Sequence, residues 1–338
     1  MTENNSTFGV SLVCSGSAVP AQVITNDELA LRVETNDEWI SSRTGIKNRR
    51  VLGPEESFSD LCLRAGASAL EMANWQPETI DLVIVASSTP DDLFGSAPSI
   101  QAKLGAKNAV AFDLTAACSG FLFALVTAAQ FLRNGSMKRA LVIGADQLSS
   151  WIDWDDRKSC VLFGDAAGAV GIESVQSECD DLIGFKLRSD GSRGNCLNLL
   201  EKRNFRSLVN TTMNQEGGFS NIQMNGQEVY KFAVREVPVI LKDVLETSGI
   251  NPEKLDWLLL HQANKRILDA VADRLKISHE KVLSNLSKYG NTSAATIPLM
   301  LDEAVRDGRV KPGHLIASSG FGAGLSWGAA VFRWHGPT

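Results

Sequence analysis

The chain has 338 residues, enough for two domains of ordinary size or for one unusually large domain. Apolar residues make up 44% of the sequence and charged residues 21%, which is typical of a folded globular protein and excludes disordered and fibrous chains. The formal net charge is −6, so the chain offers no overall positive field, and we expect neither a nucleic acid nor a membrane as partner.

The six cysteines form no C-x-x-C pair, which argues against a zinc site, a redox dithiol or a disulfide scaffold and favours a reducing cytoplasm. The polar N-terminus shows no basic region followed by an apolar stretch, so we expect no secretory signal. Five of the cysteines are expected to be small buried side chains, namely Cys14, Cys62, Cys160, Cys179 and Cys196.

An apolar run at residues 82–87 predicts a buried parallel strand, and a second apolar run follows at 140–145. Between them, Asp113 and Arg133 enclose 19 residues without a charge, close to the length that spans a bilayer. Because the stretch contains polar residues such as Gln130, we interpret it as a helix buried on all sides rather than as a membrane span.

The second part of the chain repeats these features at a nearly constant distance. An apolar run at 257–260 closes with His261, an uncharged stretch covers 290–301, and residues 314–319 echo 140–145. Each feature lies 173 or 174 residues after its counterpart. A period of this length indicates a duplicated strand–helix unit rather than a solenoid repeat.

We therefore predict two similar α/β halves, residues 1–175 and 176–338, joined by a solvated acidic connection over residues 172–182. One helix in each half is uncharged around its circumference, and two such helices are covered if they lie together between two sheets. The predicted fold is thus layered α/β. The polar, Gly-rich segment 188–222 is interpreted as a long excursion over one face, often a functional lid in compact domains.

Three polar residues stand where apolar ones are expected. Cys118 directly precedes the apolar helix, whose N-terminus would favour the thiolate, lower the pKa of the thiol and make it a nucleophile. His261 ends a strand, where ligands bind in open α/β sheets, and Asn291 follows Gly290. Each has an ordinary alternative: a small buried hydrophobe for Cys118, a strand cap for His261 and a turn or helix cap for Asn291.

The repeat brings these three residues together. A shift of 173 places Asn291 at the position in the second half that Cys118 holds in the first, so both would lie at the N-termini of the paired buried helices. With His261 from a neighbouring strand end, a thiol, an imidazole and a carboxamide would then share one pocket.

The residues that flank these three form extended motifs. They read Leu-Thr-Ala-Ala-Cys-Ser-Gly at 114–120, His-Gln-Ala-Asn at 261–264, Tyr-Gly-Asn-Thr-Ser-Ala-Ala at 289–295 and Gly-Phe-Gly-Ala-Gly at 320–324. Further segments are Thr-Asn-Asp-Glu-Trp-Ile at 35–40, Arg-Thr-Gly-Ile at 43–46, Phe-Gly-Asp at 163–165 and Trp-Gly at 327–328. Together, in this order and over nearly the whole chain, they resemble β-ketoacyl-acyl carrier protein synthase III, of the thiolase fold.

The resemblance implies a layered α-β-α-β-α thiolase fold and an initiating condensing enzyme. Acetyl-CoA would acylate Cys118, and malonyl-acyl carrier protein would then lose CO2 and attack the thioester to give acetoacetyl-acyl carrier protein. His261 and Asn291 would each donate an N–H to the enolate. By resemblance, the backbone N–H groups of Cys118 and Ala323 would form the oxyanion hole, provided that φ of Ala323 is allowed. Neither a metal nor a redox cofactor is implied, and the cytoplasm is the expected location.

The resemblance also assigns the substrate contacts. Trp39 and Arg157 match residues that sandwich the CoA adenine, and Arg43 and Asn264 match nucleotide and pantetheine contacts. Phe94 and Phe321 match acyl-pocket residues, and Phe94 would reach the partner's pocket across a homodimer interface.

Carrier-protein docking is assigned to Gln262, Ala263, Asn264, Lys265 and Arg266. Lys231 and Arg274 would enlarge the basic patch that an acidic carrier protein needs.

Alternatives remain open at this point. One is a thiolase-fold condensing enzyme with another acyl-CoA primer or a role in secondary metabolism, and another is an inactive binding protein on the same fold. A thiolase proper normally uses a second cysteine near its C-terminus, and none follows Cys196. Chalcone-synthase-like enzymes share the cysteine, histidine and asparagine but lack the pattern of Trp39 and Arg43.

Overall fold

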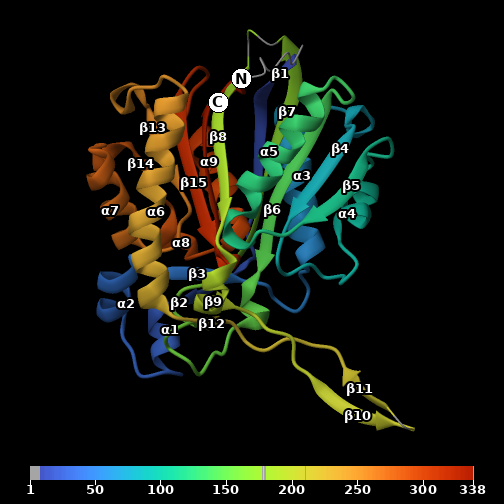
Figure 1. Ribbon diagram of the computed structural model, residues 1–338, viewed down its shortest axis with the longest axis vertical. Coiled ribbons are helices and arrows are strands. Elements are labelled where there is room, and N and C mark those ends of the chain that lie inside the picture. The colour runs from blue at the N-terminus through green and yellow to red at the C-terminus, as the bar shows by residue number, and fades with distance from the viewer. Residues whose placement is uncertain (1–7, 177, 179, 210, 338) are drawn as a thin grey trace.

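The computed structural model describes residues 8–176, 178, 180–209 and 211–337, and its core is a pair of five-stranded mixed sheets (Figure 1). The first sheet has the strand order β1-β7-β6-β4-β5. Its strands are β1 (Phe8–Ala18), β7 (Asp165–Gln176), β6 (Arg139–Gln147), β4 (Leu82–Ala86) and β5 (Val110–Leu114). The pairs β1–β7 and β7–β6 are antiparallel, whereas β6–β4 and β4–β5 are parallel.

The second sheet repeats this topology, with the order β8-β16-β15-β13-β14. Its strands are β8 (Leu182–Ser189), β16 (Ser326–Arg333), β15 (Leu315–Gly322), β13 (Trp257–Leu260) and β14 (Val282–Leu283). Here too the first two pairs are antiparallel and the last two are parallel. The same order and the same directions in both sheets confirm the duplication expected from the sequence.

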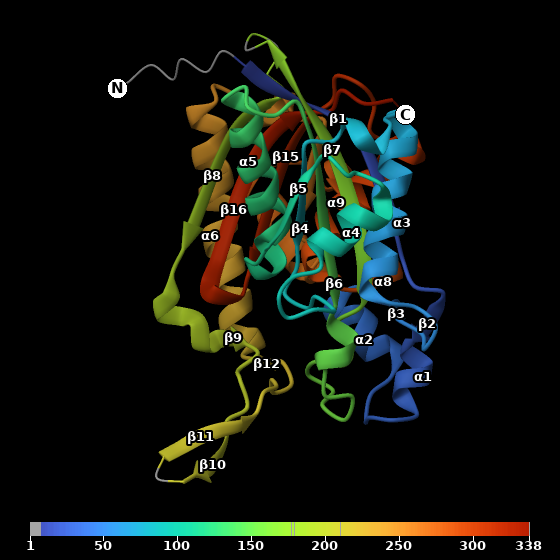
Figure 2. The same ribbon diagram turned by 90° about the vertical axis from the view of Figure 1, so that its right-hand side faces the viewer.

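Two helices, α5 (Gly120–Arg133) and α9 (Thr296–Arg306), lie between the sheets (Figures 1 and 2). Most of their side chains are buried in one apolar cluster that also contains residues of both sheets, such as Ile84 and Ile316. The uncharged stretch before Arg133 is thus a helix inside the protein, as predicted. No helix among the described residues is long and apolar enough to cross a membrane.

The outer face of each sheet carries its own pair of helices. Helices α3 (Phe58–Met72) and α4 (Ala97–Leu104) cover the first sheet, and α6 (Gly226–Thr247) and α7 (Lys265–Leu275) cover the second. The layers therefore follow the order α-β-α-β-α, which confirms the predicted thiolase fold.

The remaining elements gather at one end of the sheets (Figure 1). They are α1 (Asn26–Ala30), α2 (Asp37–Thr44), α8 (Leu286–Tyr289), β2 (Gln22–Thr25), β3 (Asn48–Val51), β9 (Leu197–Asn198) and β12 (Gln223–Met224). The hairpin of β10 (Asn204–Leu208) and β11 (Thr211–Glu216) projects away from this end (Figure 2). Only the base of the predicted lid therefore lies against the body of the protein.

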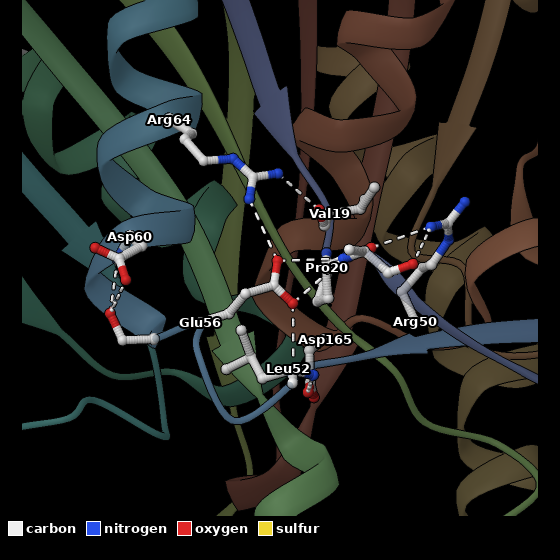
Figure 3. Close-up of polar contacts among 11 residues, drawn as sticks. Val19, Pro20, Arg50, Leu52, Glu56, Asp60, Arg64 and Asp165 are labelled. Atoms are coloured by element: carbon white, nitrogen blue, oxygen red, sulfur yellow. Dashed lines mark hydrogen bonds and ion pairs between the residues drawn. The ribbon is translucent and has the colours of Figure 1, made fainter.

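Charged side chains fix this end of the molecule to the first sheet (Figure 3). Arg64 Nη2 donates to the carbonyl oxygen of Val19 over 2.7 Å, and the Glu56 carboxylate accepts from the N–H of Ala21 over 3.2 Å. Asp165, from the Phe-Gly-Asp motif, accepts from the N–H of Leu52 over 2.9 Å. The chain after β1 is thus held by α3 and by the loop before α3, and the chain after β3 is held by β7 of the first sheet.

The structure shifts the internal alignment of the halves by three residues. The turns before α5 and α9 are the 3₁₀ helices η2 (Ala117–Ser119) and η8 (Ser293–Ala295), each beginning with a positive φ, 47° at Ala117 and 52° at Ser293. These residues lie 176 positions apart, so Cys118 corresponds to Ala294 and the predicted equivalence of Cys118 with Asn291 is wrong. A slip of three keeps most apolar positions of a helix on the same face, which is why the pattern of hydrophobic residues did not reveal it.

Two smaller predictions also need correction. The connection around 172–182 is not simply solvated, because β7 continues to Gln176, Asp180 pairs with Arg133 over 2.7 Å and Asp181 is buried. Cys196 is only partly buried, whereas the other cysteines expected to be buried are so, except that Cys179 lies outside the described residues.

Candidate active site

Cys118 lies in η2, between the end of β5 and the start of α5, at the centre of the five layers. Its backbone packs against the end of β15, and a Cβ added to Gly322 would stand 2.6 Å from the Cys118 nitrogen. Only glycine at position 322 allows this approach. The second sheet thereby supports the turn that carries the thiol of the first half.

Burial has the opposite effect on the Cys118 thiol from the one predicted. The side chain is only 7% exposed, and loss of solvent raises its pKa to about 12, although a hydrogen bond from Ser293 favours the thiolate. The negative charge of Asp146 raises the pKa further. Burial therefore favours the thiol form of Cys118, so a nucleophilic role would require a group that removes the proton.

Ser293 and Asp146 form the polar surroundings of this thiol. The Ser293 hydroxyl donates to Cys118 Sγ over 3.3 Å, and it also faces the carboxylate of Asp146, whose pKa its donation lowers. Because the hydroxyl has one proton, it donates to one of the two groups at a time, and when it donates to Asp146 its oxygen can accept from the thiol. Asp146 stands at the end of β6 and is completely buried. The three side chains link η2, η8 and the first sheet into one polar cluster.

His261 directly follows β13, at the carboxyl end of a parallel strand, and is 1% exposed. Its Nδ1 lies 2.8 Å from the hydroxyl oxygen of Thr296, and its ring meets that of Phe321 edge to face with 5.2 Å between centroids. Burial lowers the pKa of His261 to about 3, which favours the neutral imidazole.

Asn291 follows α8, and hydrogen bonds of its backbone fix its position. Its N–H donates to the carbonyl oxygen of Leu162, and its carbonyl oxygen accepts from the N–H of Gly164 over 3.0 Å. The side-chain Oδ1 accepts from the N–H of Ser293 over 2.9 Å, which leaves the side-chain NH2 group as the donor for a ligand.

Two cavities meet at Cys118. The larger, of about 590 Å³, is lined by residues such as Thr115, Leu148 and Phe219, and a smaller one of about 120 Å³ shares Cys118, Phe163 and Leu197 with it. Cys118, His261 and Asn291 all line the smaller cavity. The structure therefore brings the three predicted residues together, although the alignment that suggested it was wrong by three positions.

The backbone geometry at Ala323 is compatible with its predicted position. Ala323 begins the 3₁₀ helix η9 (Ala323–Leu325) and is not among the described residues with a positive φ. It lines the larger cavity together with Cys118.

The predicted adenine clamp is closed in this structure. The Arg157 guanidinium stacks on the indole of Trp39 at 5.4 Å from its centroid and donates to the carbonyl oxygen of Glu34 over 2.8 Å. Both side chains are exposed. An adenine can enter between them only after Arg157 swings away from Trp39.

Arg43 and Asn264 meet through the backbone. Asn264 Nδ2 donates to the carbonyl oxygen of Arg43 over 3.2 Å, while its Oδ1 accepts from the N–H of Arg266 and caps α7. Asn264 also lines the smaller cavity. Its carboxamide therefore joins α2 to α7 at the entrance to that cavity.

The two residues predicted for the acyl pocket do not share a cavity. Phe94 lines the larger cavity and is 98% exposed, whereas Phe321 lies in the smaller cavity against His261. Tyr230 lines the smaller cavity as well, and Gln227 lies exposed outside both. The direction of β15 explains the difference, because it turns the Phe321 ring toward the end of β13.

The predicted docking segment is only partly accessible. Gln262 is fully buried and donates to the carbonyl oxygens of Leu260 and Leu283, so its assignment to carrier-protein docking is wrong. Lys265 pairs with Asp269 over 2.7 Å, and Lys231 pairs with Glu228 over 2.9 Å.

Two arginines complete the patch. Arg266 lies over the ring of Tyr230, with its Cζ 6.0 Å from the centroid, and Arg274 is exposed. Neither forms an ion pair within the described part of the chain, so these two are the cations of the patch that remain available to a carboxylate.

Three residues of the site were missed from the sequence: Asp146, Ser293 and Thr296. Asp146 follows the apolar run 140–145, and the argument that selected His261 at a strand end applies to it equally. Ser293 and Thr296 adjoin the Asn291 motif but have no pattern that distinguishes them from helix-capping residues. Among the described residues, no group of histidine, cysteine and carboxylate side chains is arranged to hold a metal ion.

Comparison with known proteins supports the family that the sequence motifs indicate. A family model described as 3-oxoacyl-[acyl-carrier-protein] synthase III matches residues 112–191, and the model of its C-terminal part matches residues 245–334. A β-ketoacyl-[acyl-carrier-protein] synthase III of Prochlorococcus marinus is 71% identical over the whole length of both chains. One from a Synechococcus species is 66% identical over 98% of each.

The solved structures that resemble this chain support the same family as the similar sequences. The 3-oxoacyl-[acyl-carrier-protein] synthase III of Aquifex aeolicus is 42% identical with a TM-score of 0.88, covering 96% of this chain and 100% of that one. The priming β-ketosynthase of the R1128 polyketide pathway reaches the same TM-score at 32% identity, covering 98% and 97%. The chain belongs to the β-ketoacyl-acyl carrier protein synthase III family, the condensing acyltransferases that initiate fatty acid synthesis.

Proposed function

We propose that the chain condenses acetyl-CoA with malonyl-acyl carrier protein through an acyl thioester on Cys118. The observation that carries this proposal is the position of Cys118 between two cavities, one of which also contains His261 and Asn291. A thiol between two cavities can hold an acyl group on one side while a second substrate approaches from the other.

In the first half-reaction the Cys118 thiolate attacks the acetyl carbonyl carbon, and CoA leaves as a thiolate. The backbone N–H groups of Cys118 and Ala323 stabilise the oxyanion of the tetrahedral intermediate. The proposal is supported by Gly322, whose missing side chain lets the end of β15 approach the Cys118 nitrogen. This exchange of one thioester for another needs neither a metal nor a redox cofactor.

In the second half-reaction the malonyl thioester loses CO2, and its enolate attacks the acetyl group on Cys118. Asn291 Nδ2 and His261 Nε2 donate to the enolate oxygen. The Thr296 hydroxyl lies 2.8 Å from His261 Nδ1 and 3.1 Å from the carbonyl oxygen of Ser293. The Thr296 hydroxyl has a single proton, so its donation to Nδ1, which the tautomer with a proton on Nε2 requires, replaces its donation to the carbonyl oxygen of Ser293.

The substrates reach the site along the smaller cavity. We assign Trp39, Arg43, Arg157 and Asn264 to the CoA moiety, with Arg157 opening from Trp39 on binding. Arg266 and Arg274 supply the charge that attracts an acidic carrier protein, flanked by Ala263, Asn264 and Lys265. We expect the reaction to take place in the cytoplasm.

A homodimer completes the proposal. Phe94 and Leu93 are 98% and 83% exposed at the mouth of the larger cavity, and β5 beside them is an edge strand. Exposed apolar side chains next to an unpaired edge favour association with a second copy. A monomer in sedimentation equilibrium at micromolar concentration would contradict this assignment.

Loading of a panel of acyl-CoAs tests the proposed primer. The protein is incubated with acetyl-, propionyl-, butyryl- or isobutyryl-CoA, and the peptide that carries Cys118 is examined by mass spectrometry. We expect the acetyl adduct to form fastest, and the partly exposed Cys196 serves as an internal control that stays unmodified. Fastest loading of a longer or branched acyl group would favour the alternative of another primer, and no adduct with any acyl-CoA would contradict the function.

A further inference from the structure

The mechanism requires a base that removes the proton of the buried Cys118 thiol. Cys118 is only 7% exposed and lies where the two cavities meet. The pKa of His261 is about 3 because of burial, so its imidazole is a weak proton acceptor, and its Nδ1 is occupied by Thr296. The other polar group at the sulfur is the Ser293 hydroxyl, 3.3 Å from Sγ.

We propose that Ser293 connects Cys118 to the carboxylate of Asp146 in a proton relay that activates the nucleophile. The inference rests on the function proposed above and assigns roles to two residues outside the predicted set. As the sulfur begins its attack on the acyl carbonyl, the Sγ–H proton passes to Ser293 Oγ, and the hydroxyl proton of Ser293 passes to an oxygen of Asp146. The S–H bond breaks, an O–H bond forms on the carboxyl group, and nothing is oxidised or reduced.

The proton balance closes over the whole cycle. CoA leaves as a thiolate and takes a proton from water, while Asp146 keeps the proton of Cys118 during the life of the acyl-enzyme. When the condensation expels Cys118 as a thiolate, the proton returns through Ser293. Both ends of the relay are then restored without any further reactant.

The surroundings of Asp146 suit a base that is used repeatedly. Its carboxylate accepts from the N–H of Ser88 over 2.8 Å, from the Thr89 hydroxyl over 2.8 Å and from the N–H of Ala294 over 3.1 Å. These donors hold the carboxylate in place whether or not it carries a proton on its free lone pair. Ser293 itself is fixed with a φ of 52° and is 2% exposed, so its hydroxyl has little freedom to turn elsewhere.

Repulsion between like charges favours a single negative charge on Cys118 and Asp146 together. Burial raises the pKa of Asp146, and the charged carboxylate raises that of Cys118. The other titratable groups that face Asp146 are Cys62 of α3 and Asp165 of β7, both of which have a pKa raised in part by its charge. Passing the proton to Asp146 removes its charge at the moment when the sulfur becomes negative.

The pH dependence of Cys118 alkylation tests the relay without any substrate. The full-length protein is treated with iodoacetamide between about pH 6 and pH 10, and modification of the Cys118 peptide is measured by mass spectrometry. With the relay intact, we expect a rate that is nearly constant above the titration of Asp146 and that falls when acid protonates this carboxylate. Ser293→Ala removes the connection, so the rate at neutral pH should fall by about 100-fold and rise about tenfold per pH unit toward the pKa of the thiol.

Two further variants separate the relay from simple loss of structure. Ser119 is also buried, and among the described residues its hydroxyl donates only to the carbonyl oxygen of Ala116, so Ser119→Ala should keep the wild-type profile. Asp146→Asn keeps the carbonyl acceptor but takes up no proton, and it should reproduce the profile of Ser293→Ala if it folds.

An unchanged profile in Ser293→Ala overturns the relay, and a changed profile in His261→Ala instead would assign the base to the imidazole. Failure of the wild-type protein to accept any acyl-CoA, with the alkylation profiles as expected, would contradict the proposed function and leave the relay standing.

Discussion

His261 illustrates how burial sets the chemistry of a single residue. An imidazole with a pKa near its ordinary value of 6.5 would be charged in part at neutral pH, but desolvation lowers the pKa of His261 to about 3. The charged form is therefore present only in strong acid, and in the proposed mechanism the neutral ring donates a hydrogen bond to the enolate. We expect the decarboxylation step to show no dependence on a group that titrates near pH 6.5.

Replacing this imidazole should separate the two half-reactions. In His261→Ala, decarboxylation of malonyl-acyl carrier protein should slow by about 100- to 1,000-fold, because the enolate loses a donor, while loading of Cys118 changes by less than about threefold. Release of labelled CO2 and formation of the acyl-Cys118 peptide measure the two steps independently. The matched control is His279→Ala, since His279 is exposed and paired with Asp273, and both rates should be unchanged. Equal loss in the two steps would refute the assigned role.

At the scale of elements, the approach of β15 to η2 is the contact that would shape the proposed oxyanion site. A methyl group at position 322 would stand 2.6 Å from the Cys118 nitrogen, closer than real Cβ contacts occur, so the two backbones must move apart. Gly322→Ala should therefore reduce the rate of Cys118 acylation by about 100-fold, because a small displacement of an oxyanion donor is costly.

A glycine in open space provides the control for this substitution. Gly191 has no atom within 4 Å of an added Cβ, and Gly191→Ala should acylate at the wild-type rate. Stopped-flow release of CoA measures both variants. If Gly322→Ala loaded as fast as the wild type, the backbone groups at this contact would not form the oxyanion site.

Helices and strands could be predicted from the sequence where their burial requires a regular pattern of apolar or uncharged residues. The uncharged stretch before Arg133 could be assigned to a buried helix, and the repeated apolar runs could be assigned to two related sheets. The exact equivalence of η2 and η8 could not, because a helical pattern shifted by three residues looks nearly the same, and the signal that fixes it is a positive φ at Ala117 and Ser293.

The contrast between a polar residue and its apolar surroundings explains which residues of the site could be predicted and which could not. Cys118, His261 and Asn291 could be selected because each interrupts an apolar context. The docking role of Gln262 was wrong because exposure of one side chain in a polar segment depends on the turn that carries it, and here the side chain points into the protein. Asp146 was overlooked although it, too, interrupts an apolar run at a strand end.

The whole molecule uses its duplication to build one asymmetric site. The first half supplies Cys118 and Asp146, and the second supplies His261, Asn291 and Ser293, so that each half contributes what the other lacks. In the proposed mechanism the two cavities that meet at Cys118 form an acyl side and a substrate side of the site. A thioester at their junction is the central claim, since both half-reactions pass through it.

A single-turnover chase tests this claim most directly. Protein loaded with labelled acetyl-CoA is freed of excess CoA ester, shown by mass spectrometry to carry the acetyl group on Cys118, and then mixed with malonyl-acyl carrier protein. The label should leave Cys118 and appear in acetoacetyl-acyl carrier protein at a rate equal to or faster than turnover, with one CO2 released for each acetyl group transferred. Label that remains on Cys118 while product accumulates, or product formed equally by Cys118→Ala, would contradict the account.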